Sequence, residues 1–437
     1  MQRRRFVTTA AAATMAAHAP AAPKDSLAIL GGTPVRKDAF HSWPECDQRE
    51  EAAVTGVVRS RRWNRNTQVE KFEADYARLL GVPHVLATAN GTSALFASLH
   101  ALGVQPGDEV IVPPYTFVAT VNVVMLHHAL PVFADTDIDT FQVDPKRVAA
   151  QVTDRTTAIL PVHMAGSAAD IDALLAIGKQ KGIPVLEDAC QAHLGEWRGR
   201  KLGAWGAAGC YSFQASKNLN SGEGGAMATS DQSLFERAHA FHNNGRAPRT
   251  ASYDFSYQSG GANLRLTDFQ GAILNSQMTR IEANGRARDE NARYLTSLFE
   301  KIPGVTPARN YAGCTRSAWH LYMFRYDKRE FAGLDRAVFL KALAAEGIRA
   351  SSGYTPLNKQ PFLEAALASR AYKRLYPEKV LAEWKERTHC AANDRLCEEA
   401  VWFTQTMLLG PRGDMDQIAA AIAKIRAGAA DLAKRGV

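Results

Sequence analysis

Lys217 and Asp188 are the residues of this chain whose types and positions indicate covalent chemistry. Lys217 comes shortly after an apolar, strand-like run at residues 209–214 and is followed by a glycine-rich turn at residues 222–225. Asp188 ends the apolar run that begins at residue 184. A lysine amine condenses with an aldehyde, and a carboxylate keeps a pyridine nitrogen protonated so that the ring accepts electrons. A pyridoxal phosphate (PLP) enzyme needs these two groups, although a lysine beside a loop is more often a solvated surface charge.

A second motif has the form of a phosphate site. The segment Asn90-Gly91-Thr92-Ser93 follows the first predicted strand and opens a predicted helix. The N–H groups and the dipole at a helix N-terminus favour a phosphate, and glycine permits close approach. The competing interpretation is an ordinary helix start that Asn90 or Thr92 caps. So short a motif leaves both interpretations open.

Three further residues stand where they can reach a cofactor. Phe117 lies just past a predicted strand end and can stack on a pyridine ring; otherwise it packs in the core. Ser212, five residues before Lys217, can donate to a phosphate or be a satisfied hydroxyl in a strand. Gln191, three residues after Asp188, can reach the ring hydroxyl or be a surface amide.

Short apolar runs alternate with helical periodicity between about residues 82 and 230. The predicted strands cover residues 85–87, 109–113, 131–135, 157–163, 184–190, 209–214 and 225–228. Helices are predicted at residues 93–102, 116–128, 145–152 and 169–181. Strands that alternate with helices argue for a mostly parallel sheet covered on both faces. Ligands of such sheets bind outside the carboxyl ends of the strands, which is where Asp188 and Lys217 fall.

The later part of the chain has a different pattern. Residues 267–302 predict one long helix or two, and residues 319–326 predict a strand. A further helix is predicted at 338–347, and a closing amphipathic helix at 415–434. We interpret the chain from about residue 280 onward as a smaller α/β domain.

Taken together, these motifs resemble the DegT/StrS family of PLP-dependent sugar aminotransferases, which have the fold type I architecture. The resemblance extends from about residue 30 nearly to the C-terminus, and its most specific segments are residues 91–95, 107–120, 187–192, 211–217 and 222–225. It implies an α/β fold: a large domain with a mostly parallel sheet covered by helices, and a smaller C-terminal α/β domain. The expected divisions are an N-terminal arm with helices at 23–80, a PLP-binding large domain at 81–280 and a small domain at 281–437.

The resemblance also implies roles for the candidate residues. Lys217 bonds covalently to PLP and acts as the general base, and Asp188 pairs with the pyridinium. Gln191 lies near the ring oxygen, and Phe117 stacks on the ring. The phosphate ligands that the resemblance implies are Gly91, Thr92 and Ser212.

Three more positions follow from the resemblance. Asn263 matches a family asparagine that reaches the phosphate of the neighbouring subunit, which implies a homodimer with shared active sites. His320 matches a segment near the substrate entrance, but it is equally well a satisfied strand histidine, and both interpretations stay open. Tyr354 is expected on the substrate side as well.

The expected reaction is amino transfer from glutamate or glutamine to a keto-sugar, which can be nucleotide-linked, or to a keto-cyclitol. Residues 398–405 look closest to family members that aminate cyclitol ketones. A PLP-dependent sugar dehydratase shares this fold but has histidine in place of the lysine, so Lys217 argues against it. The alternative from another class is an exported, non-catalytic sugar-binding or regulatory protein with a relict PLP pocket.

Composition bounds the remaining possibilities. The formal net charge of +8 over 437 residues forms no basic stripe interleaved with aromatic residues, which argues against nucleic-acid binding. The six cysteines show no zinc-site spacing, so no metal site is expected.

The N-terminus predicts export. Arginines at 3–5 precede a weakly apolar, alanine-rich run at 8–17, which predicts a twin-arginine signal within residues 1–22 and a periplasmic or extracellular protein. The alternative is a basic, alanine-rich tail on a cytoplasmic protein. No other run approaches the roughly 18 to 20 apolar residues of a membrane helix, so stable membrane insertion is not expected.

Overall fold

The computed structural model describes residues 26–248 and 256–435. The signal segment expected at residues 1–22 lies outside the described residues, and it stays a prediction. Over the ranges described, no helix is both long and apolar enough to cross a bilayer.

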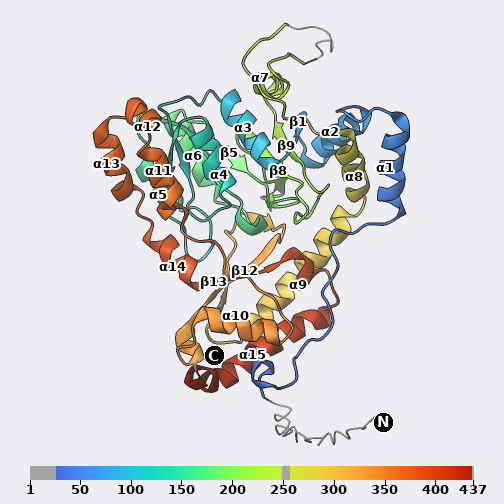
Figure 1. The fold of residues 1–437 in the computed structure, drawn as a ribbon, viewed down its shortest axis with the longest axis vertical. Helices are drawn as coiled ribbons and strands as arrows, with labels where there is room; N and C mark the ends of the chain where they lie inside the picture. The colour runs from blue at the N-terminus through green and yellow to red at the C-terminus, as the bar shows by residue number, and fades with distance from the viewer. Residues whose placement is uncertain (1–25, 249–255, 436–437) are drawn as a thin grey trace, which may run out of the picture.

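A seven-stranded sheet forms the centre of the upper part of the molecule (Figure 1). Its strands are β1 (His84–Thr88), β2 (Glu109–Val112), β3 (Leu130–Phe133), β4 (Thr156–Ile159), β5 (Leu186–Asp188), β8 (Ala208–Ser212) and β9 (Gly225–Thr229). The order across the sheet is β3-β2-β4-β5-β8-β9-β1, where parallel bridges such as Val162–Asp188 join the two halves. β9 runs against both of its neighbours, and the other strands are parallel. The mostly parallel sheet expected from the sequence is confirmed.

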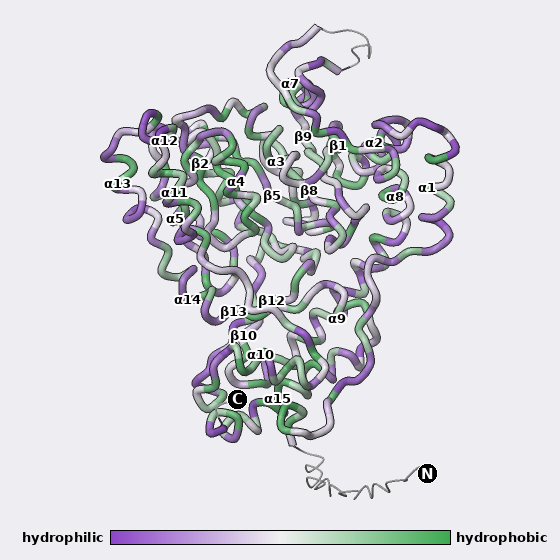
Figure 2. Tube along the Cα trace, in the orientation of Figure 1, coloured by the Kyte–Doolittle hydropathy of each residue, from purple (hydrophilic) through white to green (hydrophobic). Residues whose placement is uncertain are grey.

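Helices cover both faces of this sheet because successive strand residues point to opposite sides. They are α1 (Gln48–Ser60), α2 (Thr67–Leu80), α3 (Gly91–Ala101), α4 (Ala119–Leu126), α5 (Pro145–Gln151), α6 (Ile171–Lys181), α7 (Gln232–His242) and α8 (Asp268–Gln277). Leu86 of β1 shares a core with α3, α4 and α7, whereas its neighbours Val85 and Ala87 share the opposite core with α2, α6 and α8. Figure 2 shows hydrophobic residues along β2, β5 and α4 in the interior.

The lower part is built on an antiparallel sheet of β10 (Val305–Pro307), β12 (Leu321–Tyr326) and β13 (Ala400–Thr404). Three helices share its core: α9 (Ile281–Phe299), α10 (Arg336–Ala345) and α15 (Arg412–Arg435). The helical stretch expected at 267–302 is therefore two helices, α8 and α9. A small ribbon that the sequence did not predict consists of β6 (Glu196–Trp197), β7 (Arg200–Lys201) and β11 (Cys314–Arg316).

Part of the C-terminal sequence returns to the large sheet. The segment contains α11 (Pro361–Leu367), α12 (Arg370–Leu375), α13 (Glu378–Arg387) and α14 (Ala391–Glu399). Trp384 of α13 is buried and donates from Nε1 to the carbonyl of Pro131 in β3 (2.7 Å). Residues 361–387 thus pack with the upper part, although they fall inside the small domain expected at 281–437. The boundary at residue 280 precedes α9 directly, and the division itself stays a prediction.

The N-terminal arm connects the two parts, running from the lower part up to α1 (Figure 1). Arg36 forms a buried ion pair with Asp414 of α15 (2.7 Å). Farther along, Trp43 donates from Nε1 to the carbonyl of Ala215 (2.9 Å). The arm therefore ties the lower part to the loop that carries Lys217.

Candidate active site

A cavity of about 580 Å³ lies between the upper and lower parts, at the carboxyl ends of β1, β2, β5 and β8. All the candidate residues of the sequence analysis except Asn263 line it. They are Gly91, Thr92, Phe117, Asp188, Gln191, Ser212, Lys217, His320 and Tyr354. The fold thus gathers residues spread over more than half of the chain into one cavity.

The N-terminus of α3 opens onto this cavity. Asn90 caps the helix, since its side chain accepts from the N–H of Ser93 (2.8 Å). A Cβ atom on Gly91 would lie 2.9 Å from both Cys190 Sγ and Ser212 Cβ, so only glycine fits without displacement. The N–H groups of Gly91 and Thr92 have no intrahelical acceptor and can bind an anion. The helix is capped by Asn90, as the structural interpretation of the motif expects. Its first turn also lines the cavity, and the phosphate site stays a prediction.

Both carboxylate oxygens of Asp188 accept hydrogen bonds. Thr120 donates from Oγ1 to Asp188 Oδ2 (2.9 Å), and the N–H of Cys190 donates to Oδ1 (3.1 Å). The preceding residue, Glu187, points to the opposite side of β5. Burial raises the pKa of Glu187, but hydrogen bonds from His163 and from backbone N–H groups outweigh burial and lower it overall. One strand thus buries two carboxylates, and the one on the cavity side is Asp188.

Lys217 stands in a loop, five residues beyond the end of β8 at Ser212, rather than at the end of the strand as predicted. Beyond Ser212, the N–H groups of Phe213 and Ala215 donate to the carbonyls of Gly224 and Gly222 in the glycine-rich turn. These bonds hold residues 213–215 against the turn, so the strand ends before Lys217. Burial lowers the pKa of Lys217 below its usual value, against the opposing effects of Cys190 and Asp188. Its Nζ atom lies 3.5 Å from Nε2 of His320. A buried amine of lowered pKa is a suitable nucleophile and proton carrier.

Ser212 is positioned by residues that the sequence analysis missed. His193 Nε2 lies 2.8 Å from the Ser212 carbonyl, and its Nδ1 lies 2.9 Å from the hydroxyl of Tyr76. Burial lowers the pKa of His193 to about 4, so the ring is neutral. The ring stacks on Phe213, which completes the support behind the strand. His193 directly follows the Gln191-Ala192 motif, but its contact with Tyr76 spans 117 residues and leaves no local signal.

Gln191 is not the surface amide, and Phe117 is not the core side chain, that their structural interpretations expected. Gln191 is buried, not a surface amide: its Oε1 accepts from the N–H of Ala165 (2.7 Å), and its Nε2 donates to the Tyr354 hydroxyl (3.3 Å). Burial raises the pKa of Tyr354 to about 12, so this hydroxyl is protonated. Phe117 is 57% exposed rather than packed in the core, so its ring is free to contact a ligand.

His320 and Asn263 have different surroundings. His320 is buried just before β12, with Nδ1 3.2 Å from Asn218 Oδ1, and it also lines the cavity. It is therefore a satisfied histidine that also lines the cavity, and its role near the substrate entrance stays a prediction. Asn263 does not line the cavity; it pairs with Asn243, just after α7, in an antiparallel bridge, and the next residue, Leu264, accepts from the N–H of Ala89 after β1 (2.7 Å). Its predicted contact with a neighbouring subunit stays a prediction.

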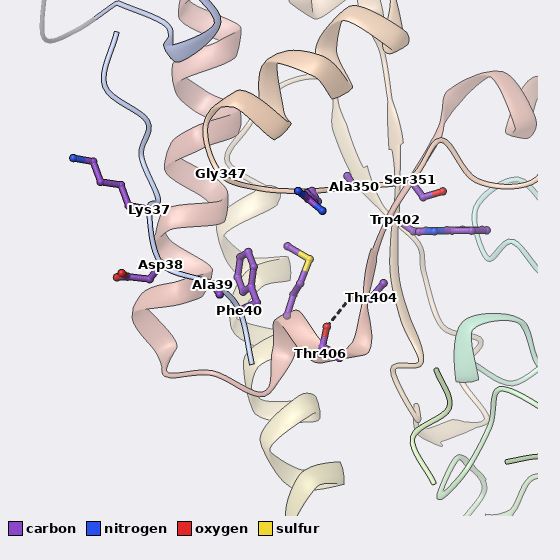
Figure 3. Close-up of a pocket in the computed structure, with 12 residues that line it drawn as sticks. Lys37, Asp38, Ala39, Phe40, Gly347, Ala350, Ser351, Trp402, Thr404 and Thr406 are labelled. Atoms are coloured by element: carbon purple, nitrogen blue, oxygen red, sulfur yellow. Dashed lines mark hydrogen bonds between the residues drawn. The ribbon is translucent and has the colours of Figure 1, made fainter. Parts of the chain in front are cut away.

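A second, outer groove of about 710 Å³ lies on the far side of β13, against the N-terminal arm (Figure 3). Trp402 borders both spaces, and its indole points away from Phe40 and toward the inner cavity (Figure 3). In the outer groove the charged residues Lys37 and Asp38 are exposed on the arm. The half-buried Lys217 and the buried Asp188 share the inner cavity, which is therefore the candidate active site.

Comparison with known proteins assigns the chain to a family. The model of the DegT/DnrJ/EryC1/StrS aminotransferase family matches residues 44–380. The chain belongs to this family. Its resemblance to DegT/StrS enzymes is confirmed, and the protein is an aminotransferase.

Curated relatives and solved structures agree. The chain is 36% identical over 414 residues to a putative L-glutamine:3-amino-2,3-dideoxy-scyllo-inosose aminotransferase from Streptoalloteichus tenebrarius, covering 92% of this chain and 97% of the relative. It is 34% identical to the L-glutamine:2-deoxy-scyllo-inosose aminotransferase of the same organism, covering 91% and 97%. The crystal structure of 3-amino-5-hydroxybenzoic acid synthase matches with a TM-score of 0.81 and 31% identity, over 90% of this chain and all of that one. The fold type I architecture expected from the sequence is confirmed.

Proposed function

We propose that this protein uses PLP to transfer an amino group from glutamine or glutamate to a keto-cyclitol or keto-sugar. The observation that carries the proposal is the meeting of Lys217 and Asp188 in one cavity beside the N-terminus of α3. Aminotransferases of this family are PLP enzymes. The relatives named for transfer from L-glutamine to inososes favour glutamine as donor and a cyclitol ketone as acceptor.

The residues present fit the cofactor. The close approach of Gly91 to Ser212 and Cys190 makes a cradle that any side chain would fill, and N–H groups of α3 face it. We assign the phosphate to Gly91, Thr92 and Ser212. Asp188, which accepts from Thr120 and from the Cys190 N–H, would face the pyridine nitrogen, and the exposed ring of Phe117 would stack on the cofactor. Gln191 would lie by the ring oxygen, between Ala165 and Tyr354.

The chain's own residues then have distinct tasks. When bound, the cofactor supplies an electron sink for the carbon that loses its proton. Lys217 carries that proton on Nζ, since burial lowers its pKa and leaves a larger fraction of the amine unprotonated near neutral pH. The Asp188 carboxylate would accept a hydrogen bond from the protonated ring nitrogen. Tyr354 and Gln191 orient polar groups of the acceptor, and β13 with Trp402 closes the cavity on the lower side.

We further propose a homodimer in which Asn263 completes the partner's phosphate site. Asn263 lies outside the cavity of its own chain, next to the end of β1. Phe117 at the cavity mouth and Trp63 are each more than half exposed, as apolar residues of an interface are in a free subunit.

Residues 1–22 are proposed as the twin-arginine signal, which N-terminal sequencing of the secreted protein tests.

The decisive test of the function is a transfer assay. The purified enzyme with PLP is incubated with glutamine and a panel of inososes and keto-sugars, and the aminated products are identified by mass spectrometry. We expect amination of at least one cyclitol ketone together with loss of the amino group from glutamine. Retention of PLP without transfer from glutamine or glutamate to any acceptor would instead support a binding protein with a relict pocket.

A further inference from the structure

His320, which lies 103 residues after Lys217 in the sequence, contacts both Lys217 and its neighbour Asn218 through its two ring nitrogens. Asn218, next to the lysine, donates from Nδ2 to the carbonyl of Ala318 (2.6 Å). The Oδ1 atom of the same amide lies 3.2 Å from His320 Nδ1. The other ring nitrogen, Nε2, lies 3.5 Å from Lys217 Nζ. The sequence analysis gave Asn218 no role.

The chemistry of these atoms fixes the position of each proton. A carbonyl oxygen only accepts, so the amide group that faces Ala318 is the NH₂ group and the one that faces His320 is the oxygen. Since an amide oxygen also only accepts, His320 Nδ1 carries the hydrogen. In a neutral ring Nε2 then has a lone pair and no hydrogen, so it can only accept. Lys217 Nζ, which faces it, is therefore the donor.

The surroundings of His320 keep its ring neutral. Burial lowers the pKa of His320 well below its usual value, and Lys217, His193 and Arg288 lower it further. Arg288 is fully buried behind the ring: its Nε donates to Gln405 Oε1 (2.8 Å), and the N–H of Gln405 donates to the His320 carbonyl (3.1 Å).

No carboxylate among the described residues forms an ion pair with Arg288, and burial lowers its own pKa to about 9. A second cation beside an unpaired buried guanidinium is unfavourable. The groups that act on Lys217 from the other side are Asp188 and Cys190.

We propose that Asn218 is a positioning residue for Lys217. By fixing His320 as the Nδ1–H tautomer, it makes Nε2 an acceptor for one N–H of the lysine amine, which turns the amine lone pair toward the cavity. The inference rests on the proposed function, in which that lone pair attacks the cofactor aldehyde. In this step a C=N bond replaces the aldehyde C=O, and the oxygen leaves as water with the two amine protons.

The first test needs no variant. Long-range ¹H–¹⁵N spectra of the ¹⁵N-histidine-labelled full chain give the tautomer of each ring, and His320→Phe identifies the signals of His320. We expect a neutral Nδ1–H ring between pH 6 and 8. An Nε2–H ring or an imidazolium at pH 7 would overturn the proposal.

The second test measures covalent capture of PLP as a function of pH. The full chain, freed of cofactor, is mixed with PLP and quenched with borohydride at successive times, and the tagged Lys217 peptide is quantified. In Asn218→Asp a carboxylate faces Nδ1–H and stabilises the imidazolium, so Nε2 becomes a donor and the lysine loses its acceptor. We expect capture at pH 7 to slow by about tenfold and to recover as the pH rises through the new histidine pKa.

The matched control is Asn220→Asp, which places the same charge in the same loop. Asn220 contacts the backbone carbonyl of Lys217 (3.5 Å) and not the imidazole, so its pH profile should keep the wild-type shape. A wild-type rate and profile in Asn218→Asp would refute the role of Asn218 alone. Absence of the tag from Lys217 in the wild-type protein would refute the proposed function instead. If Asn218→Asp does not fold, the tautomer spectra of the wild-type chain decide.

Discussion

The substitution Gly91→Ala tests the phosphate cradle with a magnitude that the structure supplies. The new Cβ would lie 2.9 Å from Cys190 Sγ and 2.9 Å from Ser212 Cβ. Carbon atoms in contact prefer about 3.5–4.0 Å, so α3 must move away from β8 or the neighbouring side chains must shift. Overpacking of this kind costs about 1–3 kcal/mol. If this whole cost arises only when PLP is bound, the affinity for PLP falls by about 5- to 150-fold.

The assay is a fluorescence titration of the cofactor-free protein with PLP, accompanied by thermal unfolding. We expect Gly91→Ala to bind PLP more weakly, and its unfolding temperature to fall if the strain is also present without ligand. Gly56→Ala is the matched control, because a Cβ at that position of α1 meets nothing within 4 Å and alanine favours a helix. Wild-type affinity and stability in Gly91→Ala would refute the assignment of the cradle.

Three further predictions concern single side chains. Asp188→Asn should leave the fold intact but reduce amino transfer by about a hundredfold, because the donor from Thr120 then meets an amide and the charge is lost; near-normal turnover would contradict the assigned role. Lys217→Met should raise the unfolding temperature of the cofactor-free protein. Burial holds the pKa of Lys217 below its unfolded value of 10.5, so the unfolded chain binds a proton that the folded chain releases. Stability of the wild type therefore rises with pH up to about 10.5. The gain in stability from Lys217→Met should be largest near pH 7 and shrink as the pH approaches about 10.5. A gain that does not depend on pH would argue against the lowered pKa of Lys217. Trp43→Phe removes the N–H donor to Ala215 and should lower the free energy of unfolding by about 1 kcal/mol in a urea titration; an unchanged midpoint would show that the contact carries no stability.

The sequence predicted the elements of the fold where burial dictates composition. Most strands of the large sheet appear as short apolar runs, because a strand buried on both faces favours apolar residues. β5 is an exception, since Glu187 and Asp188 are both buried carboxylates. The direction of β9 was not predictable, since a buried strand reads the same in either direction. The packing of α13 on β3 also escaped prediction, because the contact of Trp384 with Pro131 spans 253 residues and depends on tertiary folding.

The residues proposed to contact the cofactor could also be predicted from the sequence. The residues that support them could not. Gly91 and Asp188 stand at a helix start and a strand end, and Lys217 stands in the loop after β8, positions where local pattern and chemistry coincide. His193, Asn218 and Arg288 act through contacts that span one hundred residues or more, and each is an ordinary polar residue in its own segment. Their roles follow from burial and from the partners that the fold brings to them.

The most direct test of the account is to locate the covalent link to PLP. The protein is saturated with PLP, reduced with borohydride, digested and examined by mass spectrometry. The account predicts the pyridoxyl group on the peptide that contains Lys217, and its absence in Lys217→Met. A tag on another lysine, or no tag at saturating cofactor, would contradict it.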